Sequence, residues 1–133
     1  MWSCPKCKRE FSKNNQSHSC VVYPLANHFK DKPFGEGLFK ELVKKLDSIK
    51  FIIDSVPCCI HLVSKSTFCA AWIGKNKMKI DFKLDTVLKN KRFSKVLKMS
   101  ANRYLYYMEI KTKEEIDKEL ISWIKKSHEL TNT

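Results

Sequence analysis

The middle of the chain contains, at residues 67–84, the stretch TFCAAWIGKNKMKIDFKL. Its first half, TFCAAWI, is apolar almost throughout, as expected of a central strand covered on both faces. In its second half, apolar and polar residues alternate from Lys77 to Leu84, which is the period of a strand with one buried face. A turn at residues 74–76 joins the halves, and so short a connection is typical of an antiparallel hairpin.

Apolar runs on both sides of this hairpin predict further strands, at residues 51–53 and 59–63 before it and at residues 96–99 and 104–110 after it. Residues 85–95 have no sustained period and are expected to form a loop or a short helix. Together these runs predict an antiparallel meander of about four or five strands.

Two stretches have the period of an amphipathic helix. The first covers roughly residues 36–48 and carries an apolar stripe of Leu38, Leu42, Leu46 and Ile49. The second begins at a capping box, Thr112 to Glu115, and continues with a stripe of Ile116, Leu120, Trp123 and Ile124. The predicted fold class is therefore α+β: a small N-terminal zinc module, a helix, the meander and a C-terminal helix.

The N-terminal segment, at residues 4–20, reads CPKCKREFSKNNQSHSC. Two cysteines separated by two residues can bind one zinc ion from a single turn, and ligands two apart in an extended chain point the same way. We therefore predict a closed Zn²⁺ site made by Cys4, Cys7, His18 and Cys20. It is not expected to read DNA as a two-Cys, two-His finger does, because no recognition helix separates its ligand pairs.

The expected organisation is a zinc module at residues 1–20, a connecting loop at 21–35 and an α+β domain at 36–133. The loop is assigned because it contains two prolines and no period. Twenty residues with so few large apolar side chains cannot form a core of their own, so zinc would supply the stability of the first segment.

The motif MWSCPKCKREF…NQSHSC, followed by a helix, the TFCAAWI strand, an alternating strand and a last helix that contains Trp123, resembles an uncharacterised bacterial family of domains of unknown function. Its members are sometimes labelled "predicted transport protein", and some begin with a short zinc-ribbon-like CxxC…HxC segment. The resemblance extends over most of residues 36–130. It implies a zinc site and a single main domain, and it supplies no established activity.

The chain is strongly basic, with 26 Lys and Arg against 14 Asp and Glu and a formal net charge of +12. Such a charge suits a nucleic acid, an anionic membrane surface or an acidic protein. No apolar run is long enough to span a membrane. The first residues lack the apolar core of a signal peptide, so we expect a cytoplasmic protein with reduced thiols.

The candidate nucleic-acid-binding residues are basic and cluster between residues 65 and 103: Lys77, Lys79, Lys83, Lys91, Arg92 and Arg103. The first three would share the outer face of one strand and form a stripe suited to a phosphate backbone. The alternative is a solvated lysine face that only protects a sheet edge. Aromatic residues beside the stripe (Trp72, Tyr104, Tyr106, Tyr107) could stack on bases, although such residues in strands more often pack in the core.

Two weaker patterns involve metal-binding side chains. A second metal site is conceivable at Cys58, Cys59 and His61, but no fourth ligand is near in sequence and the context is apolar, which favours small buried residues. The acid Asp54 followed by the D-x-K of Asp81 and Lys83 is a pattern of metal-dependent nucleases, and one that arises readily by chance in a lysine-rich chain.

The sequence thus favours a zinc-stabilised module that binds nucleic acid through a basic face. The alternative is an adaptor for an acidic protein partner. A metal-dependent, nuclease-like enzyme is the third interpretation, and an activity of this kind is less favoured than binding alone. The sequence does not indicate an oligomeric state.

Overall fold

The computed structural model describes residues 2–5, 10–11, 13–15 and 23–131. In the N-terminal segment, β1 (Trp2–Ser3) pairs antiparallel with β2 (Glu10–Phe11). Cys4 follows β1 directly and is buried. The other three residues of the predicted zinc site, Cys7, His18 and Cys20, lie outside the described residues.

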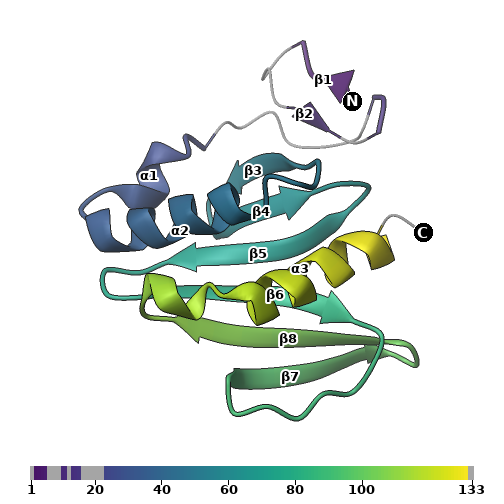
Figure 1. Cartoon of the computed structure of the whole chain (residues 1–133). Coiled ribbons are helices and arrows are strands. Elements are labelled where there is room, and N and C mark those ends of the chain that lie inside the picture. Colours follow the sequence, from purple (N-terminus) through teal and green to yellow (C-terminus); the bar gives the residue numbers. More distant parts are fainter. Residues whose placement is uncertain (1, 6–9, 12, 16–22, 132–133) are drawn as a thin grey trace.

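The main domain is α+β, as the sequence predicts, and its centre is one antiparallel sheet (Figure 1). In the described part of the chain this sheet has six strands rather than four or five: β3 (Ile52–Val56), β4 (Cys59–Val63), β5 (Thr67–Ile73), β6 (Met78–Leu84), β7 (Phe93–Ser100) and β8 (Arg103–Ile110). Their order across the sheet is β3-β4-β5-β6-β8-β7.

The order departs from a simple meander after β6, because β8 pairs with β6 and β7 takes the edge. Burial explains the exchange. In β8, Tyr106, Met108 and Ile110 are almost completely buried, whereas the residues of β7 after Phe93 are exposed. The strand with the larger apolar face occupies the inner position, and the more exposed strand takes the edge of the sheet.

Two long helices, α2 (Pro33–Lys45) and α3 (Lys118–Thr131), lie on the same face of the sheet (Figure 1). The apolar stripes predicted for them face the strands: Leu38 and Leu42 of α2, and Leu120 and Ile124 of α3, belong to the core. The domain is therefore a two-layer α/β sandwich. None of the helices in the described part of the chain is long and apolar enough to cross a membrane.

The predicted helix boundaries shift in two places. The first long helix begins at Pro33 rather than at residue 36, and a short helix α1 (Ala26–Phe29) precedes it within the predicted loop. A proline at the first helical position has a suitable φ and loses no hydrogen bond, so it marks a helix start here rather than a loop. The capping box at Thr112 is confirmed, but it opens a short 3₁₀ turn, η1 (Lys113–Glu115), ahead of α3.

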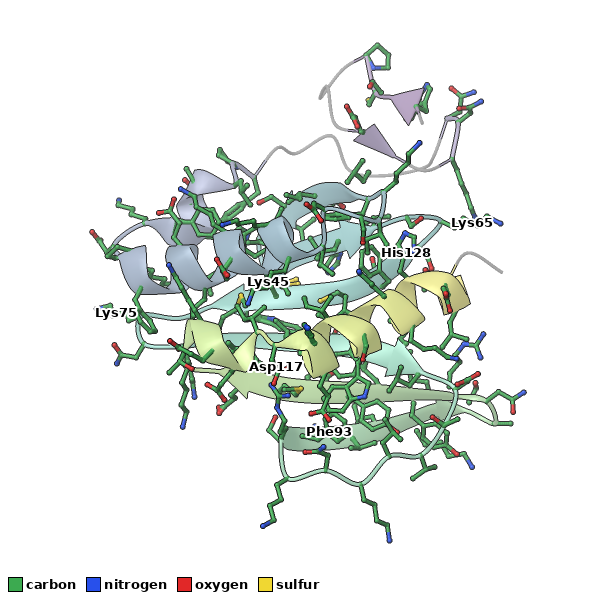
Figure 2. The ribbon with its side chains drawn as sticks, viewed as in Figure 1. Lys45, Lys65, Lys75, Phe93, Asp117 and His128 are labelled. Carbon is green, nitrogen blue, oxygen red and sulfur yellow. The ribbon has the colours of Figure 1, made fainter. Side chains whose placement is uncertain are left out.

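Helix α3 is tied to the sheet through Ser127, which is completely buried. Its Oγ donates a hydrogen bond to the Phe68 carbonyl (2.7 Å) and accepts one from the Lys83 amide (2.9 Å). The neighbouring His128, labelled in Figure 2, stands edge-on to the Phe68 ring, with 5.0 Å between ring centroids. These contacts fix the end of α3 on β5 and β6.

Candidate functional site on the open face of the sheet

The face of the sheet turned away from α2 and α3 carries a group of charged, polar and aromatic side chains. Strand pairing aligns Asp54, His61, Ala70, Asp81, Tyr107 and Lys95 in one row across all six strands. Because side chains alternate along a strand, Trp72, Lys79, Lys83 and Glu109 point to the same side. We call this side the open face, since no described helix packs on it. In Figure 1 the helices lie in front of the sheet, so the open face points away from the viewer.

The predicted burial of β5 on both faces holds for Ala70, which is buried on the open face, but fails at Trp72. One face of the strand, with Cys69 and Ala71, lies under the helices, but Trp72 on the other face is only half-buried. The apolar run TFCAAWI obscured this difference, because alanine and tryptophan are compatible with both a buried and a partly exposed position.

An aromatic and cationic cluster occupies the centre of the open face. The rings of Trp72 on β5 and Tyr107 on β8 lie 6.2 Å apart between centroids. From β6 between them, Lys79 places its Nζ 5.5 Å from the Trp72 centroid and 5.0 Å from the Tyr107 centroid. Lys95 on β7 approaches Tyr107 from the other side, at 6.0 Å. A cation over a ring face at these distances is held by the ring quadrupole.

The stripe predicted from Lys77, Lys79 and Lys83 does lie on one side of β6, since Met78, Ile80, Phe82 and Leu84 between them are buried. The three lysines differ in their surroundings. Lys77 Nζ forms an ion pair with Glu109 at 2.6 Å, so much of its charge is neutralised locally. Lys79 is exposed, and Lys83 is half-buried.

Asp81 lies between Lys79 and Lys83 on the same strand and is half-buried. Burial raises the pKa of its carboxyl group to about 6, although the hydrogen bond that Oδ1 accepts from the Ala70 amide (2.9 Å) and the two lysine charges act in the opposite direction. Desolvation therefore outweighs two nearby cations. Near neutral pH this acid weakens the positive potential of the stripe without cancelling it.

The other predicted basic residues do not join the stripe. Lys91 is exposed in the loop before β7, and Arg103, the first residue of β8, donates to the Asn102 carbonyl (2.8 Å). Arg92 faces the helical layer. Its NH1 lies 3.0 Å from both Asp117 Oδ1 and Glu119 Oε1, its NH2 donates to the Glu115 carbonyl (2.6 Å), and its guanidinium lies over the Trp123 ring at 5.7 Å. Asp117 and Phe93, labelled in Figure 2, mark this side of the sheet.

Of the aromatic residues considered for stacking, Tyr107 and Trp72 lie on the open face, whereas Tyr106 belongs to the core. The Tyr106 hydroxyl donates to the Thr86 carbonyl (2.5 Å) and accepts from the Leu88 amide (2.8 Å), so its polar end holds the loop after β6. Tyr104 packs against the core from the helix side.

A thiol and imidazole cluster lies where β3 turns into β4. Cys59 Sγ is 3.0 Å from Cys58 Sγ and 3.1 Å from His61 Nε2. Cys59 is buried, as the sequence favours, but Cys58 is exposed in the two-residue turn. Burial raises the pKa of the Cys59 thiol to about 12, with a further contribution from Cys58, and burial lowers the pKa of His61.

The fold places the acids of the D-x-K pattern, Asp54 and Asp81, on the same open face of the sheet, but not close to each other. Asp54 on β3 and Asp81 on β6 stand in the same row with two strands between them. At the usual strand spacing their backbones are about 14 Å apart, which is too far for both carboxylates to bind one Mg²⁺ ion.

Comparisons with curated proteins and with solved structures gave no match to this chain. A comparison with protein families matched residues 27–131 to a domain of unknown function, DUF5655. The matched residues include most of α1 and all of α2, the six-stranded sheet and α3, so they cover the domain that builds the open face. The chain therefore belongs to the DUF5655 family.

Proposed function

We propose that the protein binds single-stranded nucleic acid on its open face. The observation that carries this proposal is the cluster of Trp72, Lys79 and Tyr107, in which two aromatic rings and a lysine from three adjacent strands meet on a face that no described helix covers. Bases stack on aromatic rings in single-strand binding proteins, and lysines that flank the rings contact the phosphates.

A single strand suits this face better than a duplex does. The functional groups lie on a sheet surface, and no described helix projects from it that could enter a major groove. Unpaired bases can instead lie against Trp72 and Tyr107, with each stacked base contributing about 1–3 kcal/mol. Lys79, Lys83 and Lys95 supply the charge for the phosphates. Because lysine is a point charge rather than a planar fork, we expect little sequence preference.

The zinc module is a second part of the proposal. A closed site of Cys4, Cys7, His18 and Cys20 would hold the N-terminal segment together, and burial of Cys4 next to the β1–β2 pair supports a role in structure. The site has no open position, so it would serve folding rather than catalysis. Its reduced cysteines suit the cytoplasm.

The adaptor interpretation remains the alternative function, and the net charge of +12 supports it equally. The two differ in the role of the rings. An acidic polypeptide would bind to the lysines and would not stack on Trp72 and Tyr107. Nucleic-acid bases, in contrast, would stack on these two rings.

The rings therefore provide the test. Fluorescence anisotropy would measure the affinity of wild type and Trp72→Ala for a labelled single-stranded oligonucleotide and for an acidic polypeptide of equal charge. We expect Trp72→Ala to weaken oligonucleotide binding about tenfold, the loss of one stacked base, and to leave polypeptide binding unchanged. Phe34→Ala, which removes an exposed aromatic residue on α2, is the matched control. Equal loss for both ligands in Trp72→Ala would contradict the proposal.

A further inference from the structure

The side chains of Cys58, Cys59 and His61 bring two sulfur atoms and one imidazole nitrogen to one place, with all three donor atoms within 4.8 Å of one another. We infer that they form a binding site for one thiolate-preferring metal ion of the Zn²⁺ class, separate from the N-terminal cysteines. This inference does not depend on the proposed binding of nucleic acid.

Local structure explains why the donors converge. Cys59 and His61 are two residues apart on β4, so their side chains point to the same face of the sheet. Cys58 belongs to the turn between the paired residues Val56 and Cys59, where the chain reverses and its side chain can reach that of Cys59. The hairpin therefore places three ligands within four residues, without any contribution from a distant segment.

The distances between the donor atoms are close to those of a tetrahedral metal site. With Zn–S bonds of about 2.3 Å and Zn–N bonds of about 2.0–2.1 Å, tetrahedral ligands stand about 3.5–3.8 Å apart. The observed separations from Cys59 Sγ, 3.0 Å to Cys58 Sγ and 3.1 Å to His61 Nε2, are shorter than this. Each of these two pairs would need to separate by only about 0.5–0.8 Å, and Cys58 lies in an exposed turn.

A disulfide between the two cysteines is the competing chemistry, and the backbone disfavours it. Adjacent Cα atoms across a trans peptide are about 3.8 Å apart, and the described chain has no cis peptide bond. Disulfides usually need about 4.4–6.8 Å between Cα atoms. A metal ion accommodates adjacent cysteines more easily, because it bonds to both sulfurs without requiring them to touch.

The donor set also indicates the kind of site. Two thiolates and one imidazole select soft or borderline ions, Zn²⁺ or Cu⁺, over Mg²⁺ and Ca²⁺. Among the described residues, these three side chains make up the group, and a four-coordinate ion would take one further donor. Asp54 stands directly opposite His61 on β3, and its negative charge acts on the imidazole. A carboxylate beside a ligating histidine commonly orients the ring.

The test compares metal content between variants of the full chain. Reduced wild type, Cys58→Ser, His61→Gln and Cys69→Ala would be loaded with Zn²⁺, dialysed without chelator and analysed for bound metal per chain. We expect Cys58→Ser and His61→Gln each to contain one ion fewer than wild type, whatever the N-terminal cysteines hold. Cys69→Ala removes a buried thiol on the helix side and should match wild type.

A second measurement identifies the ligands directly. When Co²⁺ replaces Zn²⁺, the intensity of thiolate-to-metal charge-transfer absorption rises with the number of cysteine ligands. This absorption should fall in Cys58→Ser. In Cys20→Ser, the part that comes from Cys58 and Cys59 should remain. Cys58 is exposed in a turn, so its replacement by serine should not disturb folding. Equal Zn²⁺ content in wild type, Cys58→Ser and His61→Gln would overturn the inference. A protein mass lower by two hydrogens, seen only when both Cys58 and Cys59 are present, would also overturn it, because it would indicate a disulfide between them.

Discussion

The Lys79 ammonium nitrogen lies over the Tyr107 ring at 5.0 Å from its centroid, and the two residues stand on the neighbouring strands β6 and β8. The contact holds an exposed cation at the centre of the open face, beside Trp72. Lys79 is therefore not simply a solvated edge residue. Its position next to two rings is what relates the charge of the chain to a specific surface.

Asp81 predicts a pH dependence of stability. Its pKa is about 6 in the folded protein against an ordinary value of 3.8, so the folded state binds the proton more tightly. The contribution to stability is complete below pH 3.8 and is lost as pH rises through 6. Asp81→Asn keeps an oxygen for the Ala70 amide and should be more stable than wild type at pH 7, by up to about 3 kcal/mol.

Urea denaturation of both proteins at pH 4 and pH 7 would measure this. The advantage of Asp81→Asn should be large at pH 7 and nearly absent at pH 4, where the wild-type carboxyl is already protonated when folded. An Asp81→Asn protein that is less stable than wild type at pH 7 would mean that Lys79 and Lys83 stabilise the charged form more than burial opposes it.

At Gly35, α2 packs closely against the β5–β6 turn, and this contact predicts the effect of a larger side chain. A Cβ atom at this position would clash with the Gly74 carbonyl oxygen and would lie 2.6 Å from Ile73 Cγ2. Gly35→Ala should therefore destabilise the fold by about 1–3 kcal/mol, as overpacking does. Gly37→Ala on the same helix is the control, because its Cβ would meet only Lys113 Cε at 3.9 Å. It should stabilise by about 0.5–1 kcal/mol, and equal effects of the two changes would contradict the packing described.

The two hydrogen bonds of Ser127 link α3 to the sheet, and we expect them to contribute to the stability of the fold. Ser127→Ala leaves the Phe68 carbonyl and the Lys83 amide without the hydroxyl that now bonds to both. We expect a loss of about 1–3 kcal/mol in the free energy of unfolding. Ser122→Ala on the exposed side of the same helix is the control and should change stability by less than about 0.5 kcal/mol. Similar losses in thermal denaturation would show that the link does not matter.

The proposed N-terminal zinc site predicts a local effect of Cys20→Ser. The variant should lose one zinc ion, become sensitive to protease within residues 1–20, and keep the cooperative unfolding of the main domain, whose core is made from residues 38–124. Limited proteolysis with mass analysis would locate the cleavage. Unfolding of the whole chain in Cys20→Ser would mean that the N-terminal segment shares the core.

The parts of the fold set by local pattern could be predicted from the sequence. Residues 59–63 and 67–73 form strands with the expected boundaries, and the alternation after Lys77 correctly assigns the buried face of β6. The position of β8 between β6 and β7 could not be read in this way, since it depends on comparing the apolar faces of two strands.

The candidate site was predictable to a similar degree. The period of two placed Lys79 and Lys83 on one side of a strand, but neither the ring partners of Lys79 nor the acids around Arg92 follow from sequence spacing. The thiol and imidazole cluster did have a signal, because Cys59 and His61 are two apart in a predicted strand. Cys58 is adjacent to them in sequence, but the turn that brings its side chain to Cys59 appears only once β3 and β4 are paired.

The most direct test of the central claim is the salt dependence of oligonucleotide binding. Wild type would be compared with a variant in which glutamine replaces Lys79, Lys83 and Lys95, and with a control in which glutamine replaces three exposed lysines of the helical layer, Lys44, Lys118 and Lys126. Both variants lose the same charge. The slope of log affinity against log salt concentration would be measured for a single-stranded oligonucleotide.

Each phosphate contact on a single strand contributes about −0.7 to this slope. We expect the open-face variant to flatten the slope by about 2, the sum for three contacts, and the helical-layer control to retain nearly the wild-type value. Equal slopes for the two variants would show that binding depends on net charge alone, and that result would contradict a nucleic-acid site on the open face.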